Sequence, residues 1–251
     1  MRRFLTLLIS LVLASGAMAQ QPADGVDTAL VVAIDVSESV DAQRYKLQME
    51  GVAQALENPE VVRAITSGQR AAILFSVVQW SDAPELTVPW QRIGSAEDAH
   101  RVAAMVRALP HKGGEFTCLS RLFRYATDSL LPALPVPAAR VIVDVSGDGI
   151  DNCNVRASID EARDTLVASG ATINGLPILV PGENDIVGEG AYRAPGFGFD
   201  RVGPGTDATT LEAYFTAHVI GGPGAFLLAA QGYGDFGRAI ARKFVVEISM
   251  N

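Results

Sequence analysis

Short, continuous apolar runs alternate along the chain with segments of helical periodicity, and this alternation constrains the fold most. The runs are rich in β-branched residues and occupy residues 28–34, 71–78, 140–145 and part of 171–180. Runs of this length and composition are typical of strands that are buried on both faces of a sheet. Strands that alternate with helices predict a doubly wound α/β fold, in which a mainly parallel sheet is flanked by helices.

Helix start and stop signals lie between the apolar runs. Ser95 is a good N-cap, Asn58-Pro59 stops the first helix, and Gly170 is a natural C-cap. Residues 181–206 are rich in Gly and Pro and predict a long irregular insertion. Helices are expected over residues 41–56, 60–66, 95–109, 119–131, 157–169, 209–219 and 233–248, and further strands over residues 86–90 and 225–230.

The N-terminal residues 1–19 have the layout of a secretory signal. Arg2 and Arg3 form a basic start, residues 4–14 are mostly apolar, and Ala17 and Ala19 stand where a signal peptidase reads small residues. The apolar run is too short for a permanent membrane helix, and the alternative interpretation is a buried N-terminal helix. We therefore expect a periplasmic or secreted protein without an integral membrane segment after cleavage, whose residues 20–251 form a single domain.

The charge of the chain argues against binding to nucleic acids. The formal net charge is −8, and removal of Arg2 and Arg3 with the signal takes it to −10. Contacts with phosphates need clustered Lys and Arg, so no nucleic-acid partner is expected.

Oxygen-bearing side chains stand where predicted strands end. Asp35, Ser37 and Ser39 follow the first strand directly, and Asp148 lies in a Ser-Gly-Asp-Gly turn after a later strand. Thr117 lies between them, in a glycine-containing loop that leads into a helix. The carboxyl ends of parallel strands share one edge of a doubly wound sheet, so these side chains are expected to meet there. Oxygen-only donors suit a hard cation such as Mg²⁺.

Simpler roles exist for residues in and near this group. Ser39 or Asp41 can cap the following helix, and Asp148 can serve its turn. Asp151 and Asn152 can either orient the site or act in turns and caps. Glu38 and Glu115 are interpreted as solvated rim residues, and His100, His111 and His218 as ordinary surface or core residues because they show no ligand spacing.

The string Asp35-x-Ser37-x-Ser39, with the distant Thr117 and Asp148, resembles the metal-ion-dependent adhesion site of von Willebrand factor type A domains. The resemblance implies that these five residues hold a divalent metal, with Mg²⁺ favoured and Ca²⁺ or Mn²⁺ as alternatives. It also implies an open position for an acidic side chain of a protein partner. The phrases DVSGDGIDN and VIGGPGAF are similar to those of an exported bacterial family of type A-like proteins of unknown function, over essentially the whole mature chain.

The two cysteines, Cys118 and Cys153, invite a disulfide in an exported protein. Each follows a proposed metal ligand closely, so a shared metal would bring both to one edge of the sheet. The bond would join the two loops and shape the site in advance, whereas the alternative is a pair of free thiols.

The function expected from these features is divalent-metal-dependent binding of a protein partner, without catalysis. One alternative is a metal-dependent phosphohydrolase-like enzyme, but a haloacid dehalogenase-like phosphatase would carry an aspartate where Ser37 stands, and the chain has no GxSxG motif. The other alternative is a scaffold that keeps the fold with a degenerate site.

Overall fold

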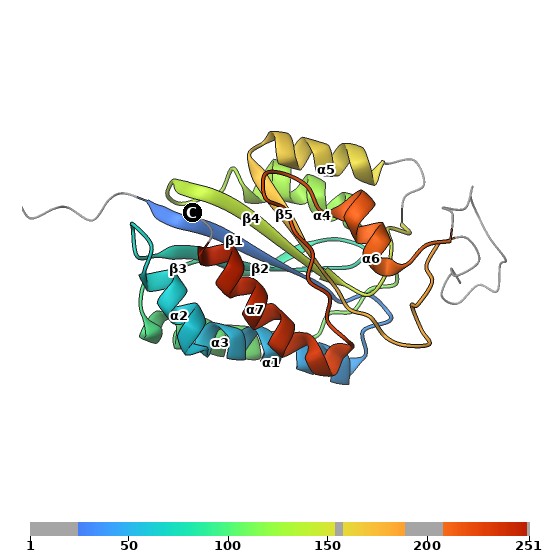
Figure 1. The fold of residues 1–251 in the computed structure, drawn as a ribbon, viewed down its shortest axis with the longest axis horizontal. Coiled ribbons are helices and arrows are strands. Elements are labelled where there is room, and N and C mark those ends of the chain that lie inside the picture. Colours follow the sequence, from blue (N-terminus) through green and yellow to red (C-terminus); the bar gives the residue numbers. More distant parts are fainter. Residues whose placement is uncertain (1–24, 154–157, 189–207, 250–251) are drawn as a thin grey trace, which may run out of the picture.

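The centre of the protein is a five-stranded sheet with the strand order β3-β2-β1-β4-β5 (Figure 1). The computed structural model describes residues 25–153, 158–188 and 208–249. All neighbouring strands pair in parallel except β3, which is antiparallel to β2, so the doubly wound, mainly parallel sheet is confirmed. The strands are β1 (Val26–Asp35), β2 (Ile73–Trp80), β3 (Glu85–Ile93), β4 (Ala138–Gly147) and β5 (Ala171–Pro177).

Helices cover both faces of this sheet, as Figure 1 shows. The first group packs with the core on one face, and the second group packs with the core on the other. The first group is α1 (Ala42–Glu57), α2 (Pro59–Thr66), α3 (Ala96–Arg107) and α7 (Phe236–Ser249), and the second is α4 (Leu119–Tyr125), α5 (Ile159–Ala168) and α6 (Leu211–Tyr214).

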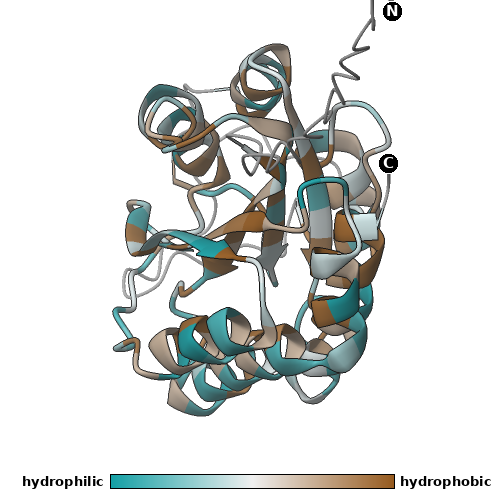
Figure 2. Cartoon of the chain, turned by 90° about the vertical axis from the view of Figure 1, so that its left-hand side faces the viewer, coloured by the Kyte–Doolittle hydropathy of each residue, from teal (hydrophilic) through white to brown (hydrophobic). Residues whose placement is uncertain are grey.

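The central position of β1 in the sheet explains why residues 29–34 are all apolar. Leu30, Val32 and Ile34 belong to the core beneath α1 and α7. Val31 and Ala33 point the other way, into the core beneath α4 and α5. Because successive side chains alternate between two buried faces, polar residues have no place in the middle of the strand. Figure 2 shows the result, with hydrophobic strand segments between two layers of helices.

The helix boundaries follow local capping chemistry. The Asp41 carboxylate accepts hydrogen bonds from the backbone amides of Gln43 and Arg44, so α1 begins after this cap. Two predicted helices end in wider, π-helical turns: α4 continues as η1 (Ala126–Leu130), and α6 continues as η2 (Phe215–Val219). The closing helix α7 is preceded by the short 3₁₀ turn η3 (Tyr233–Asp235).

The expected strand over residues 225–230 is wrong as a regular strand. The segment runs beside β5 but makes only isolated bridges, between Leu227 and Gly175 and between Ala230 and Ile178. The amide of Phe226 donates to the side-chain oxygen of Asn174 at 3.0 Å, where a continuous ladder would offer a backbone carbonyl. The Ile173 carbonyl, which would be the ladder partner, accepts from Gly221 instead, and Pro177 of β5 has no N–H to donate, so the backbone ladder beside β5 stays incomplete.

Some predicted segments lie partly or wholly outside the described residues. These are the signal at residues 1–19 and most of the insertion at residues 181–206, of which residues 181–188 form turns. Within the ranges that the structure describes, no helix is both long and apolar enough to cross a membrane.

Candidate metal centre

Five oxygen-bearing side chains meet at the carboxyl edge of the sheet. β1 ends at Asp35 and β4 ends one residue before Asp148, and the two strands are neighbours in the sheet. The Ser39 hydroxyl donates to Asp148 Oδ1 at 2.7 Å and lies 3.3 Å from the Ser37 hydroxyl. The Thr117 hydroxyl donates to the Ser37 hydroxyl at 3.4 Å, and the Ser37 amide donates to Asp35 Oδ1 at 2.8 Å. The residues proposed from the sequence are thus linked in one chain of contacts.

Most of this group is buried, and its two carboxylates repel each other. Asp35 is fully buried and Asp148 is 7% exposed, whereas Ser39 faces solvent. Burial and the negative charge of Asp148 raise the pKa of Asp35 to about 8, although hydrogen bonds from Ser37 oppose the shift. Burial also raises the pKa of Asp148, against hydrogen bonds from Ser39 and Tyr233. A bound cation would offset both the burial of these carboxylates and their mutual repulsion.

The donor set fits a hard divalent cation. Asp35 Oδ2 is buried and has no hydrogen-bond partner among the described residues, which is costly for a carboxylate oxygen. Glycines keep the space beside the donors clear: a Cβ at Gly147 would lie 3.1 Å from Asp35 Oδ2, and one at Gly149 would lie 3.3 Å from the Thr117 hydroxyl. No cluster of three or more His, Cys, Asp or Glu that could hold a metal occurs in the described ranges.

Side chains that the sequence analysis did not identify surround Asp148. The Tyr233 hydroxyl donates to Asp148 Oδ2 at 2.8 Å, and the Asn184 amide donates to the Asp148 carbonyl at 2.9 Å. Burial and the nearby charges of Asp148 and Asp35 raise the pKa of Tyr233, so its hydroxyl stays protonated. These contacts join segments far apart in the chain, and no motif in the sequence predicts them.

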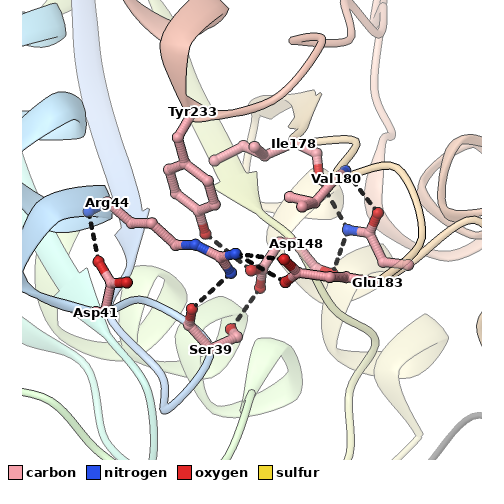
Figure 3. A network of polar contacts seen from close by, with 9 residues as sticks. Ser39, Asp41, Arg44, Asp148, Ile178, Val180, Glu183 and Tyr233 are labelled. Atoms are coloured by element: carbon pink, nitrogen blue, oxygen red, sulfur yellow. Dashed lines mark hydrogen bonds and ion pairs between the residues drawn. The ribbon is translucent and has the colours of Figure 1, made fainter.

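Arg44 lies at the rim of the same group (Figure 3). Its Nη1 donates to the Ser39 carbonyl at 2.9 Å, and its Nη2 contacts both carboxylate oxygens of Glu183 at 2.6 and 2.8 Å. The guanidinium also lies 5.1 Å from the centre of the Tyr233 ring. Arg44 therefore ties the loop that carries Ser39 to the loop after β5.

The neighbours of Thr117 have separate roles. Asn152 Oδ1 accepts from the Thr117 amide at 2.8 Å, and the backbone amide of Asn152 donates to the Thr117 carbonyl at 3.0 Å, so Asn152 holds the backbone of Thr117. Asp151 Oδ1 accepts from the Ser120 amide at 3.4 Å, in the first turn of α4, which is a capping role. Cys118 and Cys153 form a disulfide in the structure, with their Cα atoms 5.3 Å apart, within the usual range for this bond.

The sheet order and the loops at its carboxyl edge define a von Willebrand factor type A-like α/β domain. Similar solved structures include proximal thread matrix protein 1 from the mussel byssus, with 13% identity and a TM-score of 0.59 over 90% of this chain and 47% of that chain. A von Willebrand factor type A protein from Catenulispora acidiphila has 15% identity and a TM-score of 0.54 over 89% of this chain and 42% of its own. BatB from Bacteroides thetaiotaomicron has 16% identity and a TM-score of 0.51, over 88% of this chain and 98% of its own.

The chain spans less than half of the first two of these proteins, and the likeness establishes the fold. A further structure of the mussel protein, with 14% identity and a TM-score of 0.59 over 89% of this chain and 48% of that chain, is described as having a zinc-occupied metal-ion-dependent adhesion site motif. Residues 25–251 match the family described as Protein of unknown function (DUF1194), and the chain belongs to this family. No curated protein is similar to it in sequence.

Proposed function

We propose that this chain is an exported module that binds a protein partner through a divalent cation held by its adhesion-site residues. The residues are Asp35, Ser37, Ser39, Thr117 and Asp148. The observation that carries the proposal is the chain of hydrogen bonds that joins these residues, together with the buried Oδ2 of Asp35, which has no hydrogen-bond partner among the described residues. The exposed Ser39 marks the side from which a partner would approach.

The charge of the donor set suits reversible binding of an acidic group. Asp35 and Asp148 supply two negative charges, and the three hydroxyls supply none. A divalent cation bound there would act as a Lewis acid that accepts a carboxylate oxygen from the partner. Mg²⁺ is the proposed ion because the donors are hard oxygens, with Ca²⁺ and Mn²⁺ as alternatives. The zinc in the mussel protein supports a divalent ion without deciding its identity.

The surroundings of the site favour binding over catalysis. Tyr233 uses its hydroxyl proton on Asp148, and its raised pKa makes it a poor base at neutral pH. Arg44 is paired with Glu183 and the Ser39 carbonyl. A general base must be able to take a proton from a reacting group, and neither side chain is poised to do so.

Metal binding is tested by calorimetric titration of chelator-stripped protein with MgCl₂ or MnCl₂. We expect one saturable site in the wild type and no binding in Asp35→Asn, which removes the charge that lacks a partner. Asp41→Asn is the matched control, because Asp41 lies in the same loop but caps α1. Absence of binding by the wild-type protein would contradict the proposal.

Partner binding is tested by capture from an envelope fraction on immobilised protein. Capture should require the divalent ion and be lost with EDTA and in Asp148→Ala. Blocking the carboxyl groups of the captured protein should also prevent rebinding. If a partner binds equally well in chelator and to Asp148→Ala, the fold is only a scaffold.

Export is tested by N-terminal sequencing of the protein from the periplasm or the medium. Cleavage after Ala19 predicts that the mature chain begins at Gln20. A cytoplasmic chain that retains residues 1–19 would contradict this part of the proposal.

A further inference from the structure

Thr117, unlike the other four proposed ligands, comes neither from the end of a strand nor from the turn directly after one. Asp35, Ser37 and Asp148 lie at or just beyond the ends of β1 and β4, which the sheet fixes. Thr117 instead follows a stretch of irregular backbone between α3 and α4. Its hydroxyl must nevertheless reach the buried side of the site, where it lies 3.4 Å from the Ser37 hydroxyl. Other contacts must therefore hold it in place.

Side-chain contacts fix this loop on both sides of Thr117. Before it, the Asp82 carboxylate accepts from the amides of Glu115 at 3.2 Å and Phe116 at 2.7 Å. After it, Asn152 exchanges two hydrogen bonds with the Thr117 backbone. The next residues on the two segments, Cys118 and Cys153, are the disulfide pair. The disulfide thus holds Asn152 in register with Thr117.

We propose that the Cys118–Cys153 disulfide, acting through Asn152, positions Thr117 and makes the affinity of the site for a divalent cation depend on the redox state of this pair. This inference rests on the proposed metal site. Metal–oxygen coordination tolerates only small displacements, and Mg²⁺ demands near-ideal octahedral geometry. When the pair is reduced, only hydrogen bonds, those of Asn152 with Thr117 and of Asp151 with Ser120, join the two segments, and Thr117 is held less firmly.

The reaction that converts the oxidised form into the reduced form is reduction of the Cys118–Cys153 disulfide by a dithiol, through thiol–disulfide exchange. Cys118 is fully buried and Cys153 is partly exposed, so an external thiolate reaches the Cys153 sulfur first. The dithiol attacks that sulfur, Cys118 leaves as a thiolate and takes up a proton, and the second thiol of the reagent releases Cys153. Two electrons pass to the protein, which gains two thiols, while the dithiol becomes a cyclic disulfide.

The test is Mn²⁺ affinity by calorimetry in three forms of the full mature chain. These are the oxidised protein, the same protein reduced with dithiothreitol and desalted without oxygen, and the reduced protein reoxidised. We expect the affinity for Mn²⁺ to weaken by at least about tenfold on reduction and to return on reoxidation. Losses of this size are typical when contacts that orient the metal ligands are removed. Hydrogen exchange at the Thr117 amide should accelerate in the reduced form only. Thermal melts of each form show whether the protein remains folded.

Variants of Asn152 test the positioning role without touching the cysteines. Asn152→Ala should weaken Mn²⁺ binding, whereas Asn152→Asp, which keeps an oxygen acceptor for the Thr117 amide, should retain most of it. Asn58→Ala is the matched control, because Asn58 accepts a backbone amide hydrogen bond of the same 2.8 Å length at the start of α2. It should leave Mn²⁺ affinity unchanged.

The outcomes separate this inference from the proposed function. If oxidised wild-type protein does not bind Mn²⁺, the metal site itself is wrong. If it binds but the reduced protein and Asn152→Ala bind equally well, the positioning role is wrong and the metal site stands. Peptide mapping that finds two free thiols in the exported protein would also overturn the inference.

Discussion

Asp35 and Asp148 are two carboxylates buried close together, beside uncharged hydroxyls. Burial raises the pKa of both groups, and the charge of Asp148 adds to the shift at Asp35. Without a cation, the folded protein must either keep a proton in the site or tolerate the repulsion. The residues that give the site its proposed affinity for metal therefore cost stability when the metal is removed.

The variant Asp148→Asn should separate these effects. It keeps the shape of the side chain but removes one of two like charges. We expect the melting temperature in EDTA to stay level or to rise by about 2–4 °C. A rise of this size corresponds to about 1 kcal/mol of added stability in a chain of this length. The increase on adding Mg²⁺ should disappear. Asp128→Asn, an exposed position on η1, is the control, and a metal-dependent shift that persists in Asp148→Asn would contradict the assignment.

Tyr233→Phe tests the contact on the other side of Asp148. The variant leaves Asp148 Oδ2 buried without its hydroxyl donor. An unsatisfied buried acceptor costs about 1–3 kcal/mol, so the free energy of unfolding in urea should fall by that amount. Tyr125→Phe, at a partly buried position on α4, should change stability much less. Equal stability of Tyr233→Phe and the wild type would show that the hydrogen bond contributes nothing.

At the scale of elements, a buried cluster of charged and polar side chains links α7 to β4 and β5. Lys243 Nζ, which is fully buried, lies 2.6 Å from Asp144 Oδ1 on β4 and 2.6 Å from Glu247 Oε1 on α7. Asn174 on β5 donates to Glu247 Oε1 at 2.8 Å. One lysine faces two carboxylates, so the cluster has an excess of negative charge if all three groups ionise. Burial and the charge of Asp144 raise the pKa of Glu247 from 4.5 to about 8.

This cluster predicts that stability falls as the pH rises from about 4.5 to about 8. In that range folded Glu247 keeps its proton while unfolded Glu247 releases it, so rising pH favours the unfolded state. The stability that Glu247 contributes is fully present below about pH 4.5 and is lost as the pH rises through about 8. Asp144, whose pKa burial also raises, acts in the same direction.

Urea denaturation of the wild type and of Glu247→Gln across this range measures the effect. Glutamine stays neutral at every pH, so the variant should lose less stability between the two ends of the range. The comparison also cancels the contribution of Asp35, which is common to both proteins. Parallel pH profiles for the two proteins would rule out a raised pKa at Glu247.

At the scale of the whole molecule, the proposed site is a product of the fold. Two apolar cores, one on each face of the sheet, hold β1 and β4 in place. The metal is therefore not expected to be required for folding. Protein stripped with EDTA should melt cooperatively and keep its near-ultraviolet circular dichroism. Saturating Mg²⁺ should add only a few degrees, by mass action, and complete unfolding in chelator would contradict this prediction.

The amino-acid sequence by itself determined the layers of this fold and the edge at which its oxygen side chains gather. Apolar runs such as residues 28–34 can be buried only between two layers of helices, and parallel strands end at a common edge. The placement of Asp35 and Asp148 follows from these two constraints. That they hold a metal remains a prediction.

Only the tertiary structure decided which side chains from distant segments contact the residues of the proposed site and the core. Tyr233 reaches Asp148 across 85 residues, and Arg44 reaches Glu183 across 139. Lys243 meets Asp144 inside the core. Periodicity and capping are local signals, whereas a hydrogen bond or ion pair between distant segments depends on how finished elements pack. The same reason explains residues 225–230, where a strand-like run lies beside β5 but the Ile173 carbonyl accepts from Gly221 and Pro177 has no N–H to complete the ladder.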